Sequence, residues 1–193
     1  MKTALRLVAA LATLSTIACG GTAVQSDDLK GSWASPTCES IGNDTYLQRA
    51  FALTEERWSL TVNAFGDAQC QVKLFSARVG GPYTLEQDSS LVEGATEARF
   101  DFDEQFMTPH VQGLADAFQG SKCGSGTWKV GEEQSTAATG CLFFQPISAC
   151  GSDYDIVKVD GANLYFGQRP ADNNMCSADK RPTALTALPV VKR

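Results

Sequence analysis

Hydrophobic and polar residues alternate in short runs along most of the chain from Leu29 onward. Trp58, Leu60 and Val62, for example, are separated by polar residues, which places apolar side chains on one face of an extended segment and polar side chains on the other. Runs of this kind occupy residues 46–53, 58–62, 72–74, 98–102, 127–130, 141–144, 154–159 and 163–166. About nine or ten antiparallel strands at this spacing predict a mainly β protein, either a barrel or a sandwich.

One segment departs from the alternation and predicts a short helix. Thr108 is suited to the N-cap and Pro109 to the first helical position, and Gly120 follows the last apolar residue of the segment. The apolar residues that recur at helical spacing are Val111, Leu114, Ala115 and Phe118. The apolar side of this helix either packs into the hydrophobic core or covers a ligand cavity. Packing into the core is the commoner role of such an apolar stripe.

The N-terminus has the pattern of a secretion signal. Lys2 and Arg6 precede an apolar run over residues 7–17, which is too short to span a bilayer. The Ala-Cys-Gly-Gly sequence around Cys19 resembles a bacterial lipobox, in which the cysteine is acylated and becomes the new N-terminus. We therefore expect a signal peptide at residues 1–18, a flexible tether at 19–28 and a single domain at 29–193.

This leader predicts the location of the protein. A lipid anchor on Cys19 would hold the protein at a membrane in the cell envelope. The residue after this cysteine is Gly20 rather than aspartate, which resembles lipoproteins that are sorted to the outer membrane, where they face either the periplasm or the surface. Ordinary secretion with cleavage nearby is the alternative.

Apart from Cys19, six cysteines remain, which is an even number in an oxidising compartment. Three disulfides are expected, and about fifteen pairings are formally open. Zinc is the competing use of cysteine, but the chain has no Cys-x-x-Cys pair and only one histidine, His110, so no metal site is expected. The six cysteines are Cys38, Cys70, Cys123, Cys141, Cys150 and Cys176.

Charge excludes some partners. The chain has 16 basic and 22 acidic residues, and the imbalance grows once Lys2 and Arg6 are removed with the leader. Nucleic acids and anionic headgroups both favour clustered lysine and arginine, so neither is an expected partner.

The chain offers little for catalysis. His110 is the only histidine, it follows Pro109 in the first turn of the predicted helix, and we expect it to be solvated. No catalytic or phosphate-binding motif is present. Asp101, Asp103 and Glu104 could form a carboxylate pair or a calcium site, but their positions fit better the solvent-exposed face of a strand and the turn that follows it. We therefore expect a protein that is not an enzyme and needs no cofactor.

Motifs spread over the domain resemble the adenomatosis polyposis coli down-regulated family, a lipocalin-like family named after a vertebrate cell-surface Wnt inhibitor. Gly31-x-Trp33 alone is common among lipocalin-like barrels, but the later motifs are more specific and follow in the family's order with similar gaps. They are residues 94–98, Thr108-Pro109, Cys123-Gly124, residues 128–131, Gly140-Cys141, residues 166–170 and Lys180-Arg181.

The resemblance implies a twisted, partly open antiparallel barrel with an apolar cavity that takes up lipid. It also implies the pairs Cys38–Cys70 and Cys123–Cys141, which leaves Cys150 to Cys176. The vertebrate protein has two such domains and a membrane-spanning helix, whereas this chain has one domain and a lipobox-like leader. Wnt binding is therefore not expected here, and binding of a hydrophobic small molecule or lipid is.

The expected cavity residues come from the apolar faces of the predicted strands and helix. Arg49, Arg78 or Arg99 could meet an acidic head group at the rim, although a solvated strand arginine is the commoner case. A filled core with no pocket is the alternative use of the apolar residues. In that case the barrel would serve as a platform in the cell envelope, binding a protein or glycan through loops 131–140 and 167–178. The candidate cavity residues are Phe51, Leu53, Trp58, Leu60, Val62, Phe100, Phe102, Leu114 and Phe118.

Overall fold

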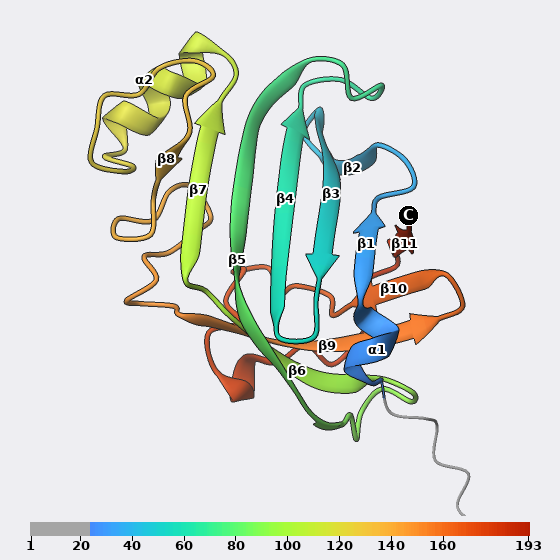
Figure 1. The fold of residues 1–193 in the computed structure, drawn as a ribbon. Helices are drawn as coiled ribbons and strands as arrows, with labels where there is room; N and C mark the ends of the chain where they lie inside the picture. Colours follow the sequence, from blue (N-terminus) through green and yellow to red (C-terminus); the bar gives the residue numbers. More distant parts are fainter. Residues whose placement is uncertain (1–23) are drawn as a thin grey trace, which may run out of the picture.

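The computed structural model describes residues 24–193, and Figure 1 shows a strongly curved antiparallel sheet with α2 at one end. The helices are α1 (Ser26–Leu29), α2 (Gln112–Gly120) and the 3-10 helix η1 (Ala178–Lys180). The strands are β1 (Gly31–Ala34), β2 (Glu39–Gly42), β3 (Thr45–Leu53), β4 (Arg57–Phe65), β5 (Lys73–Asp88), β6 (Thr96–Asp101), β7 (Glu104–Pro109), β8 (Gln134–Ser135), β9 (Ser152–Asp160), β10 (Asn163–Phe166) and β11 (Val190–Lys192). All belong to one 11-stranded sheet, which confirms the mainly β, antiparallel prediction.

Eight of the strands close into a barrel. The order around the ring is β1, β3, β4, β5, β6, β9, β10 and β11, which pairs again with β1. The 16-residue β5 pairs with β4 along one edge, while its other edge pairs first with β7 and then with β6. The sheet therefore branches at β5: β6 continues the ring, whereas β7 leaves it. Strands β2, β7 and β8 lie outside the ring.

Two glycines allow β5 to change partners. Gly80 is the last β5 residue paired with β7, and Gly81 follows it before the pairing with β6 begins at Tyr83. A Cβ atom on Gly81 would lie 2.2 Å from the carbonyl oxygen of Asp101, so the turn that joins β6 to β7 approaches the β5 backbone too closely for any side chain. In Figure 1, β5 curves from the upright strands toward β6.

The buried side chains form two hydrophobic clusters. The first lies inside the ring and includes Trp33, Tyr83 and Leu164. The second lies between α2 and the upright strands and includes Phe118, Trp128 and Met107. An apolar residue on every second position of a strand supplies one face to these clusters, as the alternation predicted.

The predicted start of the helix was wrong. Thr108 and Pro109 are the last residues of β7, where they pair with Ser76 and Phe75 of β5. The helix begins at Gln112 after Val111, which has extended backbone angles and makes no side-chain cap. The strand pairing outweighs the local capping signal. No helix within residues 24–193 is long and apolar enough to cross a membrane.

Two of the predicted strands are also absent. Residues 127–130 are irregular, because Trp128 is held by hydrogen bonds that do not belong to a sheet ladder: its indole N–H donates to the Cys123 carbonyl and its backbone N–H to Gln119 Oε1. Residues 141–144 form a tight turn in which Cys141 and Phe144 exchange backbone hydrogen bonds.

The predicted tether is too long at its C-terminal end. Val24 is buried, and its backbone N–H donates to Thr96 Oγ1 at 2.9 Å. α1 then places Leu29 in the first cluster, so the packed domain begins before residue 29. The predicted signal peptide 1–18, the lipidation site Cys19 and residues 20–23 lie outside the described residues.

Three disulfides cross-link the fold, as expected. They join Cys38 to Cys70, Cys123 to Cys141, and Cys150 to Cys176, which are the pairs that the family resemblance implied. Cys123 and Cys141 are buried in the second cluster, whereas Cys150 and Cys176 join the two segments that flank β9 and β10.

Candidate ligand-binding cavity

The barrel encloses a cavity of about 470 Å³. Strands β2, β3, β4 and β9 each supply at least two lining residues, β5, β6, β7 and β10 supply one each, and the segments that follow β6, β8 and β10 supply the rest. The apolar residues of the lining are Ile41, Leu47, Phe51, Trp58, Leu60, Val62, Val79, Phe100, Phe102, Phe143, Phe144, Phe166 and Leu188. The interior is therefore lined rather than filled, although large side chains dominate it.

Aromatic contacts fix the wall of the cavity. Trp58 packs edge-on against both Phe100 and Phe102, with ring centroids 5.2 and 5.5 Å apart. Phe51 of β3 stacks on Phe166 of β10 with centroids 4.4 Å apart. Pairs of this geometry add stability beyond the area that they bury, so the rings hold one another against the wall.

Most of the candidate cavity residues lie where the alternation predicted. Phe51, Trp58, Leu60, Val62, Phe100 and Phe102 line the cavity. Leu53, the last residue of β3, is buried but does not belong to the lining. Leu114 and Phe118 do not either, because α2 packs over the second cluster rather than over the cavity.

Other lining residues were missed. Phe166 belongs to a predicted strand, and its alternation with Leu164 was the signal that could have revealed it. Phe143 and Phe144 lie in an irregular segment, where no periodicity identifies an inward-facing side chain. Asp153 and Asp155 lie two apart on β9 and share a face, which is the sequence signal for polar groups inside the barrel.

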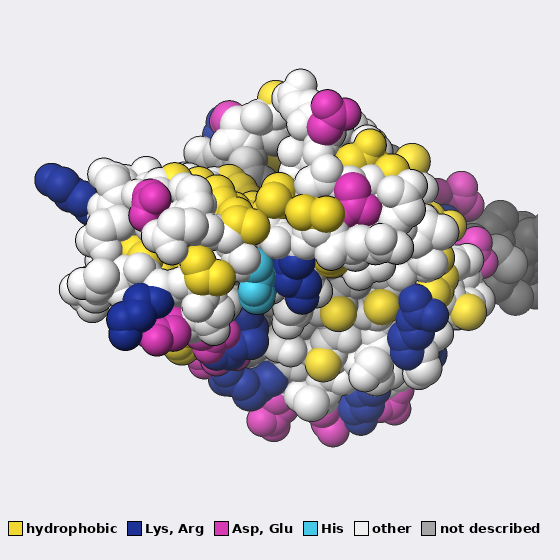
Figure 2. All heavy atoms as spheres, turned by 90° about the horizontal axis from the view of Figure 1, so that it is seen from above, with side chains coloured by type: hydrophobic (Ala, Val, Ile, Leu, Met, Phe, Trp, Pro, Cys, Tyr) yellow, Lys and Arg dark blue, Asp and Glu magenta, His cyan; other side chains and the backbone are white. Residues whose placement is uncertain are grey.

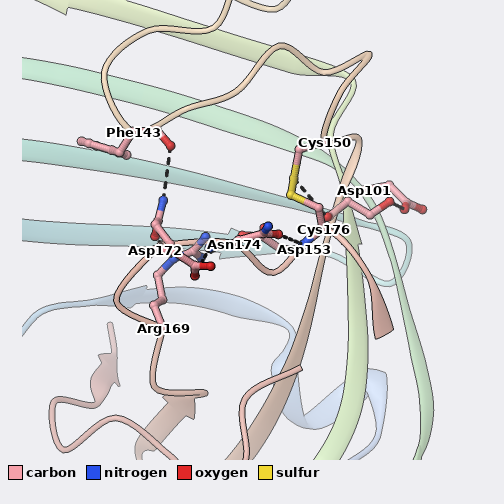
Figure 3. The surroundings of a disulfide bond; sticks show 10 residues. Asp101, Phe143, Cys150, Asp153, Arg169, Asp172, Asn174 and Cys176 are labelled. Atoms are coloured by element: carbon pink, nitrogen blue, oxygen red, sulfur yellow. Dashed lines mark hydrogen bonds and ion pairs between the residues drawn. A yellow bond between two sulfur atoms is a disulfide. The ribbon is translucent and has the colours of Figure 1, made fainter. Parts of the chain in front are cut away.

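The rim of the cavity carries exposed hydrophobic side chains. Ile41, Phe143 and Leu188 are 56%, 47% and 46% exposed, respectively. Phe143 is connected to the segment after β10, since the Asn173 side-chain amide donates to its carbonyl at 3.3 Å, and Cys150–Cys176 joins the same two segments (Figure 3). Figure 2, which views the molecule from above, shows hydrophobic side chains in a band across the face seen from that side, next to the histidine.

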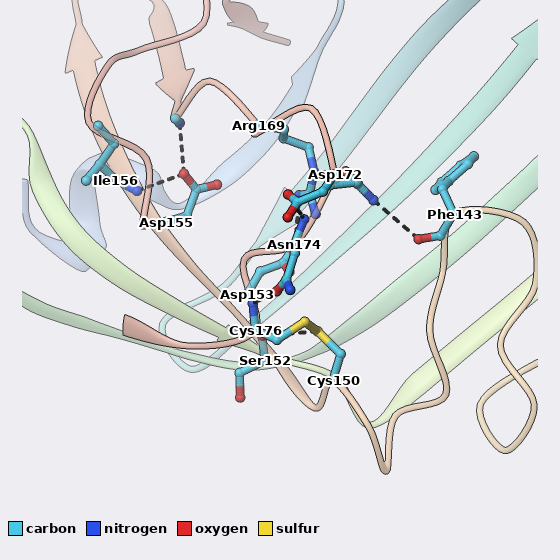
Figure 4. A network of polar contacts seen from close by, with 12 residues as sticks. Phe143, Cys150, Ser152, Asp153, Asp155, Ile156, Arg169, Asp172, Asn174 and Cys176 are labelled. Carbon is cyan, nitrogen blue, oxygen red and sulfur yellow. Dashed lines mark hydrogen bonds and ion pairs between the residues drawn. A yellow bond between two sulfur atoms is a disulfide. The ribbon is translucent and has the colours of Figure 1, made fainter. Parts of the chain in front are cut away.

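The polar part of the lining consists largely of paired charges. Arg49 binds both carboxylate oxygens of Glu39 at 2.8 Å and also donates to the Leu188 carbonyl. Arg169 binds Asp153 at 2.7 Å and also contacts Asn173 (Figure 4). Both arginines are thereby held by carboxylates of the same lining.

Asp155 is the exception. Its Oδ1 accepts hydrogen bonds from the backbone N–H groups of Ile156 and Gly167 at 2.8 and 2.9 Å, and a Cβ on Gly167 would collide with it. Its Oδ2 accepts no hydrogen bond from a described residue (Figure 4). Burial raises the pKa of Asp155 to about 7, although the two N–H groups and Arg169 act in the opposite direction.

The raised pKa predicts a pH dependence of stability. Because the folded protein binds the Asp155 proton more tightly than the unfolded chain, the carboxyl's contribution to stability falls as pH rises from about 4 to about 7. Asp155→Asn keeps an oxygen for the two N–H groups and removes the titration. In urea unfolding across this range, the wild type is expected to lose stability relative to the variant by up to about 1.4 kcal/mol per pH unit.

Asp160→Asn, at the exposed end of the same strand, is the control for that experiment. It should not reproduce the difference between the wild type and Asp155→Asn. Parallel stability curves for the wild type and Asp155→Asn would contradict the prediction.

His110 is partly exposed, and its ring is also held by a hydrogen bond. It follows β7, its backbone N–H donates to the Leu74 carbonyl, and its Nε2 lies 2.8 Å from Ser76 Oγ, which donates to Asn63 Oδ1 at 2.8 Å. With the serine proton directed to Asn63, the imidazole is the donor of its own bond to Ser76. Burial lowers the pKa of His110, with Lys73 adding to the effect.

The other candidate arginines do not reach the cavity. Arg78 binds Glu104 and Glu133, and Arg99 binds Asp101; neither arginine belongs to the lining. Only Arg49 of the three faces the interior.

The fold and the cavity define a disulfide-linked antiparallel β-barrel with a hydrophobic interior. The model of the family described as Adenomatosis polyposis coli down-regulated 1 matches residues 11–139, well over half of the chain. The chain therefore belongs to this family.

Proposed function

We propose that the protein binds a hydrophobic ligand, a fatty acyl chain or a lipid, in the barrel cavity and does not transform it. The observation that carries the proposal is the aromatic cavity with exposed hydrophobic residues at its rim. Its volume of about 470 Å³ falls in the range of about 300–1,000 Å³ typical of small-molecule sites. Burial of apolar surface contributes about 25 cal/mol per Å² removed from water.

The volume of the cavity favours a ligand with one acyl chain over a ligand with two. An apolar cavity of about 150 Å³ holds one benzene, so a cavity about three times larger holds on the order of twenty carbon atoms. That capacity suits a single long acyl chain, with its polar end at the arginine and aspartate side of the lining.

The binding proposal is tested with the full chain, purified with its disulfides intact. Native mass spectrometry combined with lipid extraction is expected to find a stoichiometric ligand. Leu60→Trp, which adds volume to the cavity wall, should reduce ligand occupancy at least tenfold. Leu91→Trp makes the same change at a residue that is 70% exposed and should leave occupancy unchanged.

A protein free of ligand that also fails to take up fatty acids, alcohols or phospholipids would contradict the proposal. It would favour instead an interaction module that binds a protein or glycan through its loops. Equal occupancy in Leu60→Trp and wild type would mean that a ligand binds elsewhere.

We also propose that Cys19 is acylated and anchors the protein in the cell envelope, with secretion as the alternative. The lipobox-like leader and the disulfides support this location. Cys19→Ala is expected to move the protein from the membrane fraction to the soluble fraction, measured by fractionation and by the mass of the N-terminal peptide. An unmodified N-terminal peptide in the wild type would contradict acylation.

A further inference from the structure

The charges that line the cavity do not balance. Among the described lining residues, the basic ones are Arg49 and Arg169, and each is held by a carboxylate of the same lining, Glu39 and Asp153 respectively. Asp155 remains without a cation of its own. Its side chain accepts from backbone N–H groups, Arg169 is bound to Asp153 at 2.7 Å, and Arg181 donates to the Asp155 backbone carbonyl and pairs with Glu86 rather than with the Asp155 carboxylate.

Asp155 is also positioned to meet a ligand. It is only 6% exposed, it belongs to the cavity lining, and its Oδ2 has no hydrogen-bond donor among residues 24–193. Oδ2 is not among the fully buried unpartnered atoms of the described residues, so it is open to the cavity, and a bound group that donates to it would gain a charge-assisted hydrogen bond. Oδ1 is fixed by Ile156 and Gly167, which holds the side chain in place for such a contact.

We propose that the cavity selects a single-chain amphiphile whose head group donates a hydrogen bond to Asp155 and carries no negative charge, such as an alcohol or an amine. This inference rests on the proposed function. The head group lies against β9, and the chain lies against the aromatic residues of β3, β4 and β6. A fatty-acid carboxylate is disfavoured because it would face Asp155 with the same charge and find both arginines already paired.

The test is a competition between three ligands with the same chain and different head groups: dodecanol, dodecylamine and dodecanoate. The full-length protein is incubated with equimolar amounts of all three at about pH 8, above the pKa of the Asp155 carboxyl. The bound fraction is extracted and quantified by mass spectrometry. The alcohol and the amine are each expected to exceed dodecanoate at least tenfold.

Asp155→Asn tests the residue itself. The asparagine oxygen can still accept from Ile156 and Gly167, and its amide then presents a donor to the cavity. Dodecylamine should lose at least tenfold in affinity relative to dodecanoate, whereas Asp160→Asn, which removes the same charge at the exposed end of β9, should keep the wild-type ratios.

The outcomes separate the two proposals. Binding of dodecanoate as tightly as dodecanol or dodecylamine by the wild type would overturn the head-group assignment and leave lipid binding intact. Unchanged ratios in a folded Asp155→Asn would overturn the role of Asp155. Failure of all three ligands to bind would overturn the proposed function itself.

Discussion

Trp33→Ala is expected to lower the free energy of unfolding by about 3–5 kcal/mol, the range for removal of a buried large aromatic side chain. Trp33 is almost fully buried, and it pairs with Phe51 of β3 on one side and Lys192 of β11 on the other. Its indole N–H donates to the Leu29 carbonyl at 2.7 Å. Because β1 and β11 are only four and three residues long, this side chain supports the part of the ring where pairing is shortest.

Urea unfolding followed by circular dichroism measures the effect, and Trp33→Phe is the matched variant. The phenylalanine keeps most of the apolar volume and loses the indole hydrogen bond, so it should cost clearly less than the alanine. Equal losses in the two variants would mean that the hydrogen bond, and not the packing, stabilises this part of the barrel.

Gly81→Ala is expected to cost about 2–3 kcal/mol although it adds a single methyl group. The new Cβ would lie 2.2 Å from the Asp101 carbonyl oxygen and about 3 Å from two further backbone atoms of the β6–β7 turn. Backbone atoms cannot rotate away as the end of a side chain can, so the turn or β5 must shift. The shift would disturb the point where β5 passes from β7 to β6.

Gly113→Ala is the control for Gly81→Ala, because it makes the same substitution in α2, where no atom beyond the chain neighbours and the backbone of the helix itself lies within 4 Å of the new Cβ. Alanine is the better helix former, so this variant should gain up to about 1 kcal/mol. If both variants have wild-type stability in the same urea experiment, the close approach at Gly81 does not constrain the fold.

The strands with regular alternation could be predicted from the sequence, because one face of each is buried and the other is exposed to solvent. β3, β4, β6 and β10 are of this kind. β7 could not be recognised, because the Thr108-Pro109 signal for a helix start coincides with its end. The 16-residue length of β5 was hidden by the glycines that allow it to bend.

The cavity was predictable only in part. Alternation identifies Trp58 and Leu60 as inward-facing but does not distinguish a lined cavity from a filled core, since that depends on the volume left between opposite walls. Phe143 comes from an irregular segment without periodicity. The state of Asp155 depends on backbone N–H groups of β9 and of Gly167, which the fold alone brings together.

β5 links parts of the molecule that would otherwise unfold separately. Phe75 and Ala77 of this strand belong to the cluster under α2, and Val79 and Tyr83 belong to the cluster inside the ring. Any opening that detaches β5 removes wall from both clusters at once. The ring and its α2-bearing extension should therefore melt in one cooperative transition, with equal calorimetric and van't Hoff enthalpies, rather than as two subdomains.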